Sequence, residues 1–81
     1  MTQSHALTEM RTGASYKVVG FTEPASAYAE KLRKMGFTKG TPIQRAAIAI
    51  HDPIIVLLRG SQIALRKTEA KCVLVEACPH A

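Results

Sequence analysis

Short apolar segments alternate with turn residues along most of the 81-residue chain. Ser15 to Phe21 alternates apolar and polar residues with a period of two, which predicts a strand, and Gly20 marks a bulge in it. The run Ile54 to Leu58 is continuously apolar and predicts a buried strand. Further strands are expected over residues 43–50, 62–66 and 72–75.

One helix is predicted after the first strand, and it ends in a sharp corner. Tyr28, Leu32 and Met35 have the spacing i, i+4, i+7 and share one helical face. Gly36 comes where this pattern stops, as expected of a residue that ends a helix in a left-handed conformation. Phe37 is expected to pack back onto the last helical turn. The residues predicted to form the corner are Leu32, Met35, Gly36, Phe37 and Gly40.

These elements predict a mainly β domain, a small and partly open β-barrel with one short α-helix between the first strand and the remaining strands. The domain is expected over residues 7–76, with flexible tails at 1–6 and 77–81. A chain of this length has room for one core only. No apolar run approaches the ~20 residues of a membrane helix. The two cysteines form no Cys-x-x-Cys motif, which favours a reducing cytoplasm.

Basic residues gather in one part of the sequence. The chain carries a net charge of +5, and no acidic residue occurs between Lys31 and Arg45. Such a patch suits an acidic protein face, nucleic acid or anionic lipid. It also suits a solvated helix end, because cations are favoured at the negative pole of the helix dipole. The candidate partner-binding residues are Lys31, Arg33, Lys34, Lys39 and Arg45.

The sequence offers little chemistry for catalysis. It contains no glycine-rich phosphate loop, no His-Glu-x-x-His motif and no paired carboxylates, so we expect no enzyme and no required cofactor. A zinc or Fe(II) ion at a surface or intermolecular site is left open, and thiolate ligands favour zinc. The alternative is a small strand residue at Cys72 and an unstructured C-terminal tail. The candidate metal ligands are His51, Cys72, Cys78 and His80.

An ordered set of turn and core residues runs from Leu7 to Val75. It comprises Leu7-x-x-Met10-x-x-Gly13, Leu32-x-x-Met35-Gly36-Phe37-x-x-Gly40-x-Pro42-Ile43, Asp52-Pro53, Gly60-x-x-Ile63-Ala64-Leu65-Arg66, Ala70 and Val73-x-Val75. In this set the chain resembles the FeoA family, the small cytosolic proteins of bacterial ferrous iron uptake. It departs from the family pattern at Lys31, where arginine is frequent, and at Lys39, where proline is frequent.

The resemblance implies an SH3-like barrel that acts as an accessory to FeoB, the membrane Fe²⁺ transporter with a cytosolic G-protein domain. It implies docking on that domain or on the transporter assembly, with assistance or modulation of GTP-dependent transport. Contact with the membrane would then occur only through the transporter, and an exposed strand edge would permit a weak homo-oligomer. A metal-responsive module that binds iron or zinc remains an alternative. A basic nucleic-acid-binding barrel is another, although no aromatic residues are interleaved with the basic ones and no stable nucleic-acid complex is expected.

Overall fold

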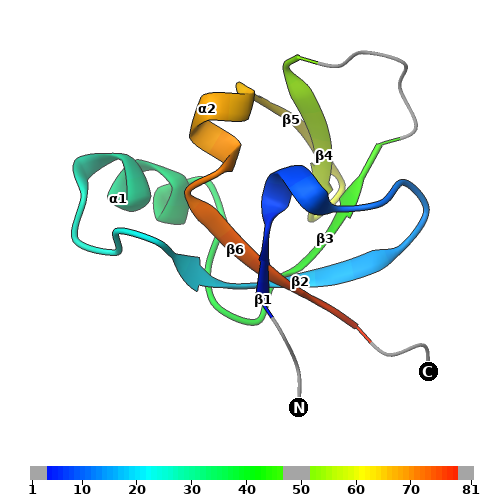
Figure 1. Cartoon of the computed structure of the whole chain (residues 1–81), viewed down its shortest axis with the longest axis horizontal. Helices are drawn as coiled ribbons and strands as arrows, with labels where there is room; N and C mark the ends of the chain where they lie inside the picture. The colour runs from blue at the N-terminus through cyan, green and yellow to red at the C-terminus, as the bar shows by residue number, and fades with distance from the viewer. Residues whose placement is uncertain (1–3, 47–51, 79–81) are drawn as a thin grey trace.

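The computed structural model describes residues 4–46 and 52–78. Its strands form one antiparallel sheet in the order β1-β6-β2-β3-β4-β5. Figure 1 shows η1 in front of the bent sheet and α1 beyond the end of β2. The mainly β, partly open barrel predicted from the sequence is confirmed. In chain order the elements are β1 (Ser4–Ala6), η1 (Leu7–Glu9), β2 (Ser15–Phe21), α1 (Ala27–Lys34), β3 (Pro42–Arg45), β4 (Ile54–Leu58), β5 (Ser61–Leu65), α2 (Lys67–Ala70) and β6 (Val73–Ala77).

Alternation along the strands fills the core as the pattern predicted. In β2, Tyr16 and Val18 are buried, and the register against β6 shifts between Val18 and Gly20. This bulge returns Phe21 to the buried side. The continuously apolar run Ile54 to Leu58 forms β4 as predicted, but only every second residue is fully buried and the two between them are half-buried. The largest fully buried side chains are Phe37, Leu7, Leu32, Ile43, Ile54, Leu58, Val18, Val56, Val73 and Val75.

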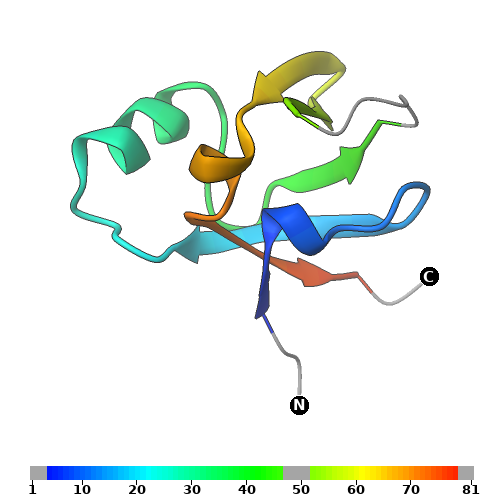
Figure 2. The same ribbon diagram turned by 45° about the horizontal axis from the view of Figure 1, so that its top comes forward.

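The corner after α1 has the predicted geometry. The Ser26 hydroxyl accepts a hydrogen bond from the Ala29 N–H at 3.0 Å and caps the start of the helix. At the other end Gly36 has a φ of +112°, and the Phe37 N–H donates to the Leu32 carbonyl at 3.1 Å. Phe37 is fully buried, which stabilises the fold by roughly 2–3 kcal/mol. In the turned view of Figure 2, α1 and this corner lie at one end of the β2–β3 pair.

Met35 does not join the buried helical face that the spacing predicted. It is the C-cap residue of α1 and remains 41% exposed. The helix ends at Lys34, so Met35, the i+7 position, lies just beyond the last helical residue. Ala29 is buried beside Leu32 instead.

Some element boundaries differ from those expected. Ser4–Ala6 was assigned to a flexible tail, but these residues form β1, which pairs with β6 through Ser4 and Glu76. Backbone pairing with a distant strand holds them, and three residues are too few to show alternation. A second short helix, α2, lies between the strands expected over 62–66 and 72–75, where no helix was expected. Of the strand expected over 43–50, residues 43–45 lie in β3, and residues 47–51 lie outside the described part of the chain.

Candidate protein-docking surface

Three lysines stand at the corner with their ammonium groups available. Lys31 and Lys34 are exposed in the last turn of α1, and Lys39 is exposed between Gly36 and Gly40. The ion pairs in the described ranges 4–46 and 52–78 join other residues, so none neutralises these three lysines. The corner therefore presents uncompensated positive charge from a backbone that glycine conformations hold in place.

The two arginines of the predicted patch contact the protein itself. The Arg33 guanidinium donates to the Pro24 carbonyl at 3.0 Å and lies 5.5 Å from the centre of the Phe21 ring. Arg45 donates from Nη1 to the Met10 carbonyl at 3.2 Å and is half-buried at the end of β3. Arg33 thus fastens the segment before α1, and Arg45 fastens the segment after η1. Within the predicted patch, the three lysines therefore stay available to a partner, whereas the two arginines are held by backbone carbonyls.

The two cysteines among the predicted metal ligands are not brought together by the fold. Cys72 precedes β6 and Cys78 follows it, so the two thiols lie at opposite ends of one strand. Six residues of extended chain span roughly 20 Å, which is too far for one ion. Within residues 4–46 and 52–78, no three His, Cys, Asp or Glu side chains gather to hold a metal. His51 and His80 lie outside the described residues, so the predicted Cys78–His80 pair stays a prediction.

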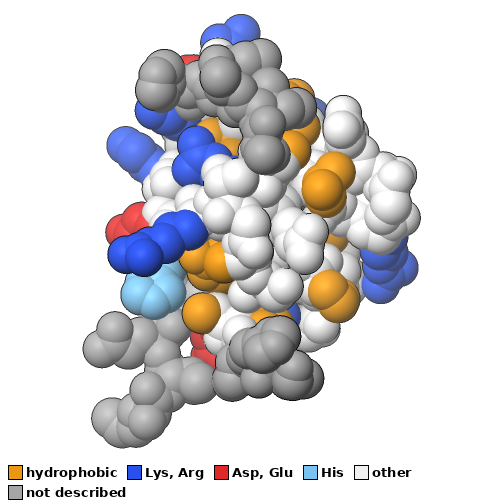
Figure 3. All heavy atoms as spheres, turned by 90° about the vertical axis from the view of Figure 1, so that its right-hand side faces the viewer, with side chains coloured by type: hydrophobic (Ala, Val, Ile, Leu, Met, Phe, Trp, Pro, Cys, Tyr) orange, Lys and Arg blue, Asp and Glu red, His pale blue; other side chains and the backbone are white. Residues whose placement is uncertain are grey.

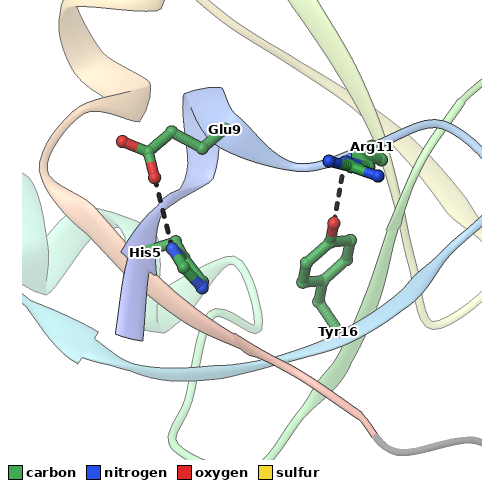
Figure 4. A network of polar contacts seen from close by, with 4 residues as sticks. All are labelled: His5, Glu9, Arg11 and Tyr16. Carbon is green, nitrogen blue, oxygen red and sulfur yellow. Dashed lines mark hydrogen bonds and ion pairs between the residues drawn. The ribbon is translucent and has the colours of Figure 1, made fainter. Parts of the chain in front are cut away.

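Polar contacts beside η1 are a feature that the sequence does not predict. His5 Nδ1 lies 3.3 Å from Glu9 Oε1, and the Tyr16 hydroxyl accepts a hydrogen bond from the Arg11 N–H at 2.8 Å (Figure 4). Together with Ala77 these residues line a hollow of about 460 Å³. The sequence does not predict the position of His5, because three residues are too few to show the pattern of a strand. The first contact joins β1 to η1 and the second joins the segment after η1 to β2, so the two fasten the N-terminal segment onto the barrel.

Tyr28, on α1, has a marked pKa shift. Partial burial of the Tyr28 side chain, together with the nearby Glu69 carboxylate, raises the pKa of Tyr28 to about 12. Both effects disfavour a phenolate, the first by removing water and the second by charge repulsion. Tyr28 on α1 thus interacts with α2 in its neutral form.

The molecule is a small, partly open β-barrel domain with an exposed basic corner. The family model described as the FeoA domain matches residues 5–77, and the chain belongs to the FeoA family. This family is associated with ferrous iron transport.

Solved structures support this assignment. The chain is 38% identical to the FeoA-like protein from Clostridium acetobutylicum, with a TM-score of 0.83, covering 100% of this chain and 94% of that one. It is 32% identical to Stenotrophomonas maltophilia FeoA, with a TM-score of 0.73, covering 93% and 88%. That relative was solved with zinc and is described as a prokaryotic SH3 domain protein, in agreement with the predicted SH3-like barrel.

A more distant structural similarity concerns the fold alone. A manganese-dependent transcriptional repressor shares the fold at 14% identity with a TM-score of 0.80, covering 96% of this chain and 44% of that one. Among curated protein sequences, none matches this chain. None of the helices in the described ranges has the length and apolar character needed to span a membrane.

Proposed function

We propose that this protein docks on the cytosolic side of the FeoB ferrous iron transporter in the bacterial cytoplasm and assists or modulates its GTP-dependent transport. The observation that carries the proposal is the set of uncompensated lysines at the corner, Lys31, Lys34 and Lys39. Membership of a family associated with ferrous iron transport supports the choice of partner. The Stenotrophomonas maltophilia relative, described as possibly a ferrous iron transport activating factor, supports the accessory role.

The chemistry of the corner suits an acidic protein face. Exposed lysines steer a charged partner during encounter and contribute to its orientation, mainly through the association rate. Gly36 and the buried Phe37 fix the backbone beneath them, so little ordering is needed when the partner binds. Nucleic acid fits less well, because Tyr16, Phe21 and Phe37 are buried and offer no stacking platform.

The test is isothermal titration against the purified cytosolic G-protein domain of the FeoB transporter, with GDP and with a GTP analogue. We expect binding that weakens with salt, and a loss of about tenfold or more in affinity for Lys31→Glu with Lys34→Glu. The matched control is Lys67→Glu with Lys71→Glu, which changes the net charge equally but lies on α2. If both double variants weaken binding equally, net charge alone explains the effect, and the proposal of a specific docking face at the corner is contradicted. Absence of binding to this domain and to the whole transporter would overturn the proposal.

A further inference from the structure

The outer face of the sheet brings together residues that lie far apart in the sequence. Ser15 pairs with Gln44, and Gln44 pairs with Leu57, so these three form one row across β2, β3 and β4. In the next row Lys17 pairs with Pro42. The residues next to them along the strands are buried in the core. Because side chains alternate between the two faces of a strand, both rows lie on the outer face. Figure 3 shows one side of the molecule, where apolar side chains reach the surface as separate patches with basic side chains nearby.

The first row lies in a hollow of about 380 Å³. Half-buried Leu57 and exposed Pro42 give it apolar walls, and Gln44 donates from Nε2 to the Ser15 hydroxyl at 3.3 Å. Arg59, in the turn between β4 and β5, stands exposed at its rim. No ion pair within the described ranges involves Arg59. The hollow is thus apolar inside and positively charged at one side.

The second row leads into another hollow, of about 320 Å³, lined in part by Lys17, Lys39, Gly40 and Glu76. Lys17 Nζ lies 3.9 Å from Glu76 Oε1, a long ion pair in which the Lys17 side chain is 46% exposed. Two lysines and one glutamate thus line this hollow. The hollow retains a positive charge that a further carboxylate would neutralise.

We propose that this outer face binds an extended segment of the partner protein that carries an apolar side chain followed by a carboxylate. The apolar side chain enters the hollow at Leu57 and Pro42, and the carboxylate sits between Lys17 and Lys39. This inference rests on the proposed function and deepens it by naming the segment that is recognised. Charge complementarity selects the occupant: Arg59 lines the first hollow, two lysines and one glutamate line the second, and a second copy of this basic chain would meet like charge.

The test measures the affinity of the full-length chain for the purified transporter, by titration or by interferometry. Leu57→Gln keeps the size of the side chain while making it polar, and we expect about fivefold weaker binding or more. Lys17→Gln, at an exposed position that leaves the fold intact, should weaken binding about threefold. Glu76→Gln removes the competing carboxylate and should tighten binding about two- to threefold. Lys71→Gln, at the end of α2, is the control and should change nothing.

The outcomes separate this inference from the proposed function. If the wild-type chain binds and the change of Lys31 and Lys34 weakens it, while the variants at Leu57, Lys17 and Glu76 bind as the wild type does, the inference is wrong and the docking proposal stands. If the wild-type chain does not bind the transporter at all, both are wrong. If sedimentation shows a dimer that Leu57→Gln dissociates, a second copy is the occupant and the inference is overturned.

Discussion

The corner after α1 and the outer face of the sheet use their residues in opposite ways. At the corner, the Phe37 ring is fully buried, the Arg33 guanidinium binds a carbonyl, and Gly36 adopts a positive φ. On the outer face, Lys17 has only a long ion pair and Leu57 remains half-buried. The fold depends on these three corner residues more than it depends on Lys17 or Leu57. Side chains whose chemistry the fold does not require are the better guide to a binding partner.

The largest expected effect separates the two regions by stability. Phe37→Ala removes a fully buried ring and should lower the free energy of unfolding by about 3–5 kcal/mol. Leu57→Ala, at a half-buried outward position, should lower it by about 1–2 kcal/mol. Denaturant unfolding followed by circular dichroism measures both. Equal losses would mean that the outer face is as important to the fold as the corner.

A smaller effect tests how tightly the corner is built. Gly36 has a φ of +112°, and a Cβ there would lie 3.1 Å from Leu58 Cδ2. Gly13 also has a positive φ, +85°, but a Cβ there meets nothing within 4 Å. Gly36→Ala should therefore lower the free energy of unfolding by about 2 kcal/mol, and Gly13→Ala by about 1 kcal/mol. If thermal melting gave the same loss for both, the contact with Leu58 would play no part.

The smallest effect concerns the contact between α1 and α2. The pKa of Tyr28 rises from 10.0 to about 12 on folding, so the unfolded chain releases this proton first as the pH increases. The stability linked to Tyr28 is present in full below pH 10 and is lost as the pH rises toward 12. Tyr28→Phe should lose less stability than the wild type across this interval. Melting temperatures at pH 9 and pH 11 provide the measurement, and parallel losses in the two proteins would contradict it.

The corner could be predicted because its determinants lie close together in the sequence. The spacing of Tyr28 and Leu32, the glycine that follows, and the buried Phe37 all act within ten residues. The burial predicted for Met35 is wrong because local hydrogen bonds set the last helical residue, and the periodicity of apolar residues does not reveal them.

The outer face could not be predicted for the opposite reason. Its first row joins residues 15, 44 and 57, and only the strand register brings them together. The same limit applies to the basic residues. Arg33 and Arg45 look like Lys31 in the sequence, yet both arginines contact carbonyls of distant segments and the lysine does not. Charge could be read from the sequence, but which charges remain available could not.

Strand β5 has a consequence for how copies of this chain meet. It is an edge strand whose five residues carry no charge and no proline, so it lacks the usual protection against pairing with another strand. Arg59 precedes it and Arg66 follows it, both exposed. Antiparallel pairing of two β5 strands would bring Arg59 of one copy near Arg66 of the other. Mutual repulsion at both ends opposes such pairing, and high ionic strength screens it. Concentrated salt should therefore favour pairing between the β5 strands of two copies.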